Sequence, residues 1–189
     1  LTDGGVYKLN GFRPDIVVYA KALGGGYAIS AVVGTHAVMT HAEDTFISST
    51  MWTERLGFTA AIACLKKMEK QSVQEKLVDY GIKIKNGWKK ASQEEGVKIK
   101  INGLNSIPNF TFDYDNSTEL LTYFNQEMLA RGFLASSSTA TTFAYTDEII
   151  DDYLNSVVEV FKRINDLDFI VKKYLMGPIK HSTFARLTG

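Results

Sequence analysis

Cysteine, proline and histidine are scarce in this chain. Its 189 residues include one cysteine, three prolines and three histidines. A single cysteine excludes an intramolecular disulfide framework and a cysteine-rich metal cluster. Cys64 lies in the apolar run AAIACL, so we expect it to be a small core residue. The histidines His36, His41 and His181 stand in no metal-ligand spacing and are interpreted as surface or cap residues, so no metal site is predicted.

The chain also lacks net charge and long apolar runs. Lys and Arg number 21, as do Asp and Glu, so no charge excess favours nucleic acid or an anionic membrane as a partner. No apolar run approaches the ~20 residues of a membrane span, and no signal peptide is recognisable, so the cytoplasm is the expected compartment. The composition is 45% hydrophobic and 12% aromatic, which predicts a folded core rather than disorder.

The most informative stretch is residues 14–34, PDIVVYAKALGGGYAISAVVG. An apolar run at residues 16–20 predicts a strand that ends at Lys21, and a second strand is expected at residues 29–33 after a triple-glycine turn. Ligands collect at strand ends in α/β sheets. A partly desolvated lysine there can act as an amine nucleophile and form a Schiff base with a carbonyl. By position alone, a solvated lysine whose stem packs on the sheet is the more common case, and the glycines and the hydroxyl turn shift the interpretation.

Three hydroxyl residues, Ser48, Ser49 and Thr50, form a predicted turn just before a helix. Hydroxyl and backbone N–H groups at a helix N-terminus suit a phosphate, although such a cluster can also be an ordinary helix cap. A Schiff-base lysine, a phosphate-binding turn and glycines that leave room for a planar group are what pyridoxal phosphate requires. A P-loop is excluded because Lys21 precedes the glycines and no Gly-Lys-Ser/Thr follows.

The rest of the chain predicts mixed structure. A short helix is expected at 35–40, capped by Thr35, and a short strand at 45–47. Further predicted elements are helices at 54–69 and 71–95, strands at 97–101 and 107–114 joined by a turn at 102–103, a helix at 117–131 capped by Ser117, a short extended piece at 133–135, and a long helix capped by Thr146. This order is typical of a small α+β domain that follows a larger unit. We place the boundary near Gly81, which gives domains 1–80 and 81–189.

These motifs carry a family resemblance. The stretch PDIVVYAKALGGGYAISAVVG resembles the lysine segment of class III (fold type I) aminotransferases. FISSTMWTERLGFTAAIACL resembles the family's next signature, and NQEMLARGFLASSSTATTFAYTDEIIDDYLNSVVEVF its carboxy-terminal domain. The tail GPIKHSTFARLTG is similar to that of glutamate-1-semialdehyde aminomutase-like members. The resemblance implies an α/β fold: part of the large pyridoxal-phosphate-binding domain over 1–80, then a small α+β domain over 81–189.

The resemblance also implies roles for individual residues. Lys21 would be the Schiff-base lysine for pyridoxal phosphate and the base for the proton shift. Thr50, with Ser49 beside it, would bind the cofactor phosphate, usually that of the partner subunit, which implies a homodimer with a shared active site. The expected function is amino transfer from a small amine, amino acid or amino sugar. The alternatives are intramolecular transfer of the aminomutase type and a non-catalytic remnant that serves as a structural or binding partner.

Several departures from the family pattern shape these expectations. Ala28 replaces the usual proline, and Thr53-Glu54-Arg55 replaces the usual Ser-Gly-Asn-Pro. Residues 135–145 contain no arginine, so a substrate carboxylate held there by a guanidinium fork is not expected, although Arg55 could substitute for it. The family's pyridine-nitrogen aspartate, stacking aromatic residue and amino-terminal phosphate loop precede the lysine segment. We therefore expect a carboxy-terminal part of a longer polypeptide that is inactive by itself.

Overall fold

The computed structural model describes residues 4–51 and 53–181, so part of the predicted tail signature lies outside the described residues. The chain divides into two compact units, Leu1–Glu75 and Lys76–Gly189, and each is described by itself. The division falls near the start of α3 (Val73–Glu94), somewhat before Gly81. The domain boundary at Gly81 remains a prediction.

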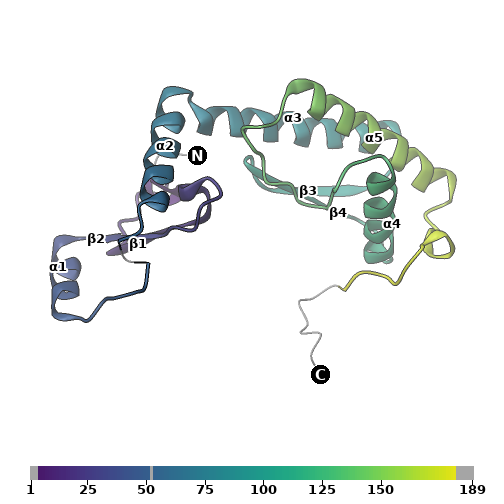
Figure 1. The fold of residues 1–189 in the computed structure, drawn as a ribbon. Helices are drawn as coiled ribbons and strands as arrows, with labels where there is room; N and C mark the ends of the chain where they lie inside the picture. Colours follow the sequence, from purple (N-terminus) through teal and green to yellow (C-terminus); the bar gives the residue numbers. More distant parts are fainter. Residues whose placement is uncertain (1–3, 52, 182–189) are drawn as a thin grey trace. The chain divides into compact units, whose positions relative to one another are not determined.

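A β-hairpin carries the lysine of the first unit. β1 (Ile16–Tyr19) pairs antiparallel with β2 (Ala31–Gly34), in a register that runs from Ile16↔Gly34 to Tyr19↔Ala31 (Figure 1). The connection contains a 3₁₀ helix, η2 (Lys21–Gly24), so the predicted order of strand, lysine and glycine turn is present. A second 3₁₀ helix, η1 (Val6–Lys8), precedes β1.

The segment after β2 is helical and then irregular. α1 (His36–Met39) and η3 (Thr40–Asp44) occupy the place of the predicted short helix. Thr35 is the N-cap residue of α1 as predicted, although its side chain makes no capping hydrogen bond and only its backbone oxygen accepts N–H groups from α1. The predicted strand at 45–47 is also wrong: Phe46 is 97% exposed, and no backbone partner is described for a strand there. A strand forms only where its N–H and C=O groups find a partner.

α2 (Leu56–Lys70) confirms the predicted helix of the first unit. Its buried face carries small residues, with Gly57 and Ala61 buried and Cys64 partly buried. Small side chains allow a helix to approach another backbone closely, and this face contacts the η2 turn. Leu56 is not part of that face, because it is 64% exposed.

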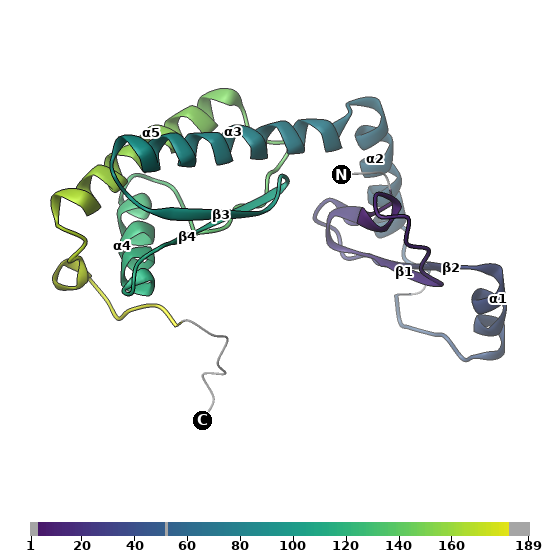
Figure 2. The same ribbon diagram turned by 180° about the vertical axis from the view of Figure 1, so that it is seen from behind.

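The second unit surrounds one aromatic core. Its elements are the Lys76–Glu94 part of α3, β3 (Ile99–Leu104), β4 (Ile107–Phe112), α4 (Ser117–Ala130), α5 (Asp147–Asp166) and η4 (Lys172–Tyr174). α3 and α5 lie side by side along the β3–β4 hairpin, and α4 packs against β4 and α5 (Figures 1 and 2). Phe110 on β4 is fully buried, and the Trp88, Phe124 and Phe161 rings meet it edge-on at centroid distances of 4.9, 5.3 and 6.0 Å. Such aromatic contacts stabilise beyond their buried area.

The hairpin turn is not where the Asn-Gly signal predicts it. Leu104 pairs with Ile107, so the turn is formed by residues 105–106, and Gly103 lies within β3 with a φ of 82°. Contacts with α3 hold this turn: Lys85 Nζ donates to Gly103 O at 2.8 Å and to Asn105 Oδ1 at 3.0 Å. The turn therefore follows its tertiary contacts rather than the local signal.

Of the two helix caps predicted in the second unit, one is confirmed and one is wrong. Thr146 caps α5 as predicted, because its hydroxyl oxygen accepts the Ile149 N–H at 3.3 Å. Ser117 does not cap α4, whose N-cap is Asn116. The Asn116 side chain is engaged elsewhere, donating to Phe169 O at 2.9 Å.

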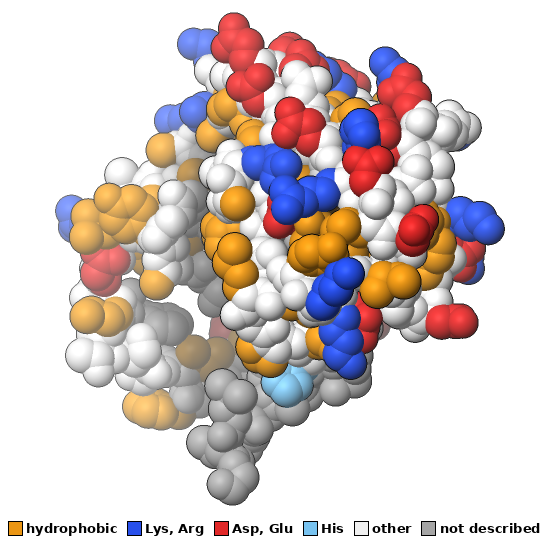
Figure 3. All heavy atoms as spheres, turned by 90° about the vertical axis from the view of Figure 1, so that its right-hand side faces the viewer, with side chains coloured by type: hydrophobic (Ala, Val, Ile, Leu, Met, Phe, Trp, Pro, Cys, Tyr) orange, Lys and Arg blue, Asp and Glu red, His pale blue; other side chains and the backbone are white. Residues whose placement is uncertain are grey.

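Charges of both signs intermix on the face of the molecule shown in Figure 3. Lys83 on α3 pairs with Asp151 at 2.7 Å and Asp147 at 2.9 Å on α5, and the hydrogen bonds from these carboxylates raise the pKa of Lys83. Within residues 4–51 and 53–181, no helix has the length and apolarity to cross a bilayer. The same residues contain no group of three His, Cys, Asp or Glu side chains arranged for a metal.

Candidate active site

Lys21 follows the end of β1 in an unusual backbone conformation. Its φ is 54°, in the left-handed region that residues other than glycine rarely adopt. Ala20 before it is fully extended, and two hydrogen bonds close the following turn, Leu23 N to Ala20 O and Gly25 N to Ala22 O, both at 3.2 Å. Such a conformation costs about 1–3 kcal/mol and persists only where its surroundings hold it. Ser72, Asp168 and Phe169 also have positive φ values. Backbone outliers of this kind cluster at functional sites, so the conformation of Lys21 agrees with the role that the sequence indicates.

The Lys21 side chain is exposed, and the described residues offer it no hydrogen bond or ion pair. Its expected partial desolvation is therefore wrong for this structure. The neighbouring strands explain the exposure, because Val18 and Val32 of the hairpin are themselves 64% and 54% exposed. The first unit thus presents the amine of Lys21 without covering it.

The triple glycine serves mainly to pack the turn, which corrects the expectation that it leaves room for a planar ligand. A methyl group at Gly24 would lie 2.8 Å from Ile29 Cγ2, and one at Gly25 would collide with Cys64 Sγ on α2. Only Gly26 faces open space within 4 Å. The first two glycines therefore bring the turn that follows Lys21 close to its neighbours.

The hydroxyl turn differs from its expected setting. Ser48, Ser49 and Thr50 are exposed, and Thr50 lies in a turn well before α2 begins at Leu56. Within the described chain, none of the three hydroxyls has a hydrogen-bond partner, and no hydrogen bond joins them to Lys21. They remain free to donate to an anion.

The N-terminus of α2 is already occupied by an acidic side chain. Glu54 accepts the Leu56 N–H through Oε1 at 2.6 Å and the Gly57 N–H through Oε2 at 3.2 Å. A carboxylate in this position satisfies these free N–H groups and the helix dipole. Phosphate binding by Ser49 and Thr50 stays a prediction and would rest on their own hydroxyl groups. Sequence reasoning missed this role of Glu54, although an acidic residue just before a helix is a recognisable capping signal.

The lysine part of this arrangement fits pyridoxal phosphate. A Schiff base needs an accessible amine without an ion pair, and Lys21 provides one on a fixed backbone. The phosphate would depend on Ser49 and Thr50, whose hydroxyls are exposed, and not on the α2 N-terminus. Arg55, the other candidate for binding a substrate group, is exposed next to this helix end.

Known proteins resemble the chain in both sequence and structure. The chain is 29% identical over 167 residues to 3-aminobutyryl-CoA aminotransferase of Cloacimonas acidaminovorans (strain Evry), which covers 82% of the chain and 40% of that protein. It is 24% identical to glutamate-1-semialdehyde 2,1-aminomutase of Sulfurihydrogenibium sp. (strain YO3AOP1), over 87% of the chain and 42% of that protein. The PLP internal aldimine form of the Sphingopyxis sp. MTA144 FumI protein has a TM-score of 0.78 at 23% identity, over 86% of the chain and 40% of the solved one.

The chain therefore spans about 40% of the length of the curated relatives that it matches. The solved structures share its fold, that of pyridoxal-phosphate-dependent transaminases, as the sequence resemblance implied. Residues 4–163 match the family described as aminotransferase class-III. This match covers most of the chain, which belongs to the class-III aminotransferase family.

Proposed function

We propose that the chain is the lysine-bearing part of a pyridoxal-phosphate-dependent enzyme that transfers an amino group between small molecules. The observation that carries the proposal is the exposed Lys21, fixed in a left-handed conformation at the end of β1 within a class-III aminotransferase sequence. Lys21 Nζ would hold the cofactor through its aldehyde carbon. When bound, pyridoxal phosphate withdraws electrons from the substrate carbon that carries the amine.

Lys21 would also move the proton. Once the substrate amine has displaced it, Nζ is a free base on a fixed backbone and can take a proton from the substrate carbon and return it elsewhere. Ser49 and Thr50 would donate hydroxyl hydrogen bonds to the phosphate. In this proposal they serve the partner subunit of a homodimer, which acts in the cytoplasm.

The substrate side of the proposal rests on what surrounds the site. Residues 135–145 contain no arginine to grip a carboxylate, so an amine or amino sugar fits as well as an amino acid. One relative, 28% identical over 156 residues, is 2'-deamino-2'-hydroxyneamine transaminase of Streptomyces kanamyceticus. The aminomutase relative favours a second function, intramolecular amino transfer. Turnover without an added keto-acid acceptor would identify the mutase.

The test is borohydride reduction of the full-length polypeptide loaded with pyridoxal phosphate, followed by peptide mapping. The label should fall on Lys21, and Lys21→Ala should abolish it. Lys66→Ala removes an exposed lysine from α2 and serves as the matched control, which should keep the label. A label on any other lysine would overturn the assignment.

A further inference from the structure

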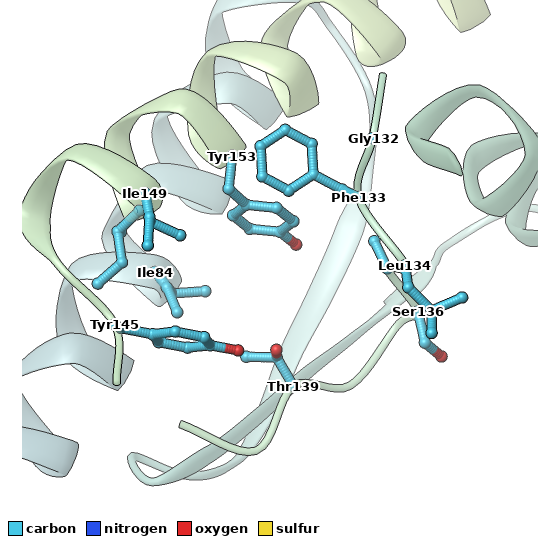
Figure 4. A pocket seen from close by; sticks show the side chains of 11 residues that line it. Ile84, Gly132, Phe133, Leu134, Ser136, Thr139, Tyr145, Ile149 and Tyr153 are labelled. Atoms are coloured by element: carbon cyan, nitrogen blue, oxygen red, sulfur yellow. The ribbon is translucent and has the colours of Figure 1, made fainter. Parts of the chain in front are cut away.

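The second unit contains a cavity of about 210 Å³, to which the proposed function assigns no ligand. It lies between α3, the first two turns of α5 and the chain that follows α4, residues 132–139 (Figure 4). Ile84 comes from α3, whereas Ile149 and Tyr153 come from α5. Three segments far apart in the sequence therefore form one hollow.

The walls of the cavity combine apolar side chains with a few hydroxyl groups and carry no formal charge. None of its eleven lining residues is Lys, Arg, Asp, Glu or His. Its mouth carries two apolar side chains turned to solvent, with Leu134 95% exposed and Ile149 45% exposed. A charged ligand would lose its hydration here without gaining a counter-charge, which disfavours its binding. The cavity thus favours a neutral occupant that has both an apolar body and a polar atom.

One hydroxyl gives the cavity a directional polar group. Tyr153 Oη accepts the indole N–H of Trp88 at 3.0 Å, and no acceptor for its own proton is described in the second unit. Burial raises the pKa of Tyr153, so this hydroxyl keeps its proton throughout the physiological range. Figure 4 shows it pointing into the hollow. The Trp88 bond fixes its position, which leaves the proton for a ligand oxygen.

The opposite wall is also fixed in place. Tyr80 donates its hydroxyl proton to Tyr145 O at 2.8 Å, and the two rings lie 6.3 Å apart. Tyr145 and Thr139 both line the hollow and carry hydroxyl groups (Figure 4). A preformed cavity loses little entropy when it binds a ligand.

We propose that this cavity binds a small uncharged molecule or group, about the size of a substituted benzene ring, whose oxygen accepts a hydrogen bond from the Tyr153 hydroxyl. The volume sets the size, the uncharged walls set the neutrality, and the free hydroxyl proton sets the position of the acceptor. Its lining includes Ala135, Ser136, Thr139 and Tyr145 of the 135–145 segment considered above for the substrate. The proposal requires no contact with Lys21.

Anisole and toluene test the proposal as a matched pair, because they differ by the ether oxygen. The experiment titrates each into the full-length polypeptide labelled at isoleucine methyl groups and follows Ile84, Ile149 and Ile150 by NMR. Anisole should shift these methyl resonances and bind about 3- to 10-fold more tightly than toluene, the range for one neutral hydrogen bond. Benzoate should leave them unmoved.

Variants separate the hydroxyl from the cavity. Tyr153→Phe should make anisole and toluene bind equally. Tyr114→Phe is the control. It also removes a tyrosine hydroxyl that accepts an N–H group, here the backbone N–H of Lys98, but Tyr114 does not line the cavity. This variant should still bind anisole more tightly than toluene. Ile149→Asp, at a partly exposed position, should weaken both probes. Unshifted methyl resonances, equal wild-type affinities, or equal losses in the two tyrosine variants would overturn the proposal.

Discussion

Gly25 is the residue whose replacement most directly tests how the turn after Lys21 is held. Its φ is 56°, and a methyl group on it would collide with Cys64 Sγ. Gly11 is a matched control, with a φ of 67° and nothing within 4 Å of an added methyl group. Alanine in the left-handed region costs about 1–2 kcal/mol at either position. Crowding against Cys64 should add about 1–3 kcal/mol at Gly25 alone, towards the lower end if the thiol rotates aside.

The measurement is the free energy of unfolding from urea titration of Gly25→Ala, Gly11→Ala, Cys64→Ala and the Gly25→Ala/Cys64→Ala double variant. Gly25→Ala should be less stable than Gly11→Ala, and removing the sulfur should recover most of that difference. The double variant should therefore be more stable than the sum of the single changes predicts, because the two sites touch. Equal costs for the two glycine variants, or strict additivity in the cycle, would refute packing of this turn on α2.

Three further predictions concern the second unit and the helix caps. Thr146→Ala should lower the free energy of unfolding, measured by urea titration, by about 1 kcal/mol because it removes a side-chain cap of α5. Thr35→Ala is the control: it removes no side-chain cap and should change the same quantity by less than half as much. Burial raises the pKa of Tyr153 in the folded state, so the unfolded chain loses this proton first as the pH rises above about 10. The free energy of unfolding should therefore fall there by up to about 1.4 kcal/mol per pH unit, and Tyr153→Phe should show a shallower fall over the same pH series. Gly81→Ala would place a methyl group against the backbone oxygen of Asn105, so it should displace the hairpin turn and lower the midpoint of thermal unfolding. An unchanged midpoint would contradict this close contact.

Elements with long, regular patterns could be predicted from the sequence. α2, α3, α4 and α5 occur within a few residues of their expected ranges because their apolar residues recur at helical spacing. The Thr146 cap was predictable because one side chain and one nearby N–H form it. The lysine-and-glycine motif was also local enough to indicate the family.

Features that depend on distant groups could not be predicted. The N-cap of α4 is Asn116 rather than the predicted Ser117, and the side-chain amide of Asn116 donates a hydrogen bond to the backbone oxygen of Phe169. Residues 45–47 have the composition of a strand but find no partner in the described chain. The hairpin turn moved away from Asn102-Gly103 because the register and the contacts with α3 place it at residues 105–106. In each case a local preference of a few tenths to about 1 kcal/mol was decided by the presence or absence of tertiary partners.

The sequence by itself determined the family, the helices and the lysine expected to carry the chemistry, because these depend on residue identity and on short-range spacing. Only the tertiary structure decided what the neighbouring residues do. It showed that the glycines pack the turn against Ile29 and Cys64, that Glu54 occupies the α2 N-terminus, and that Lys21 is exposed in a left-handed conformation. It also brought Tyr153, Tyr145 and Ile84 around one uncharged cavity. The physical reason is that packing and burial are properties of groups distant in sequence, which no local pattern encodes.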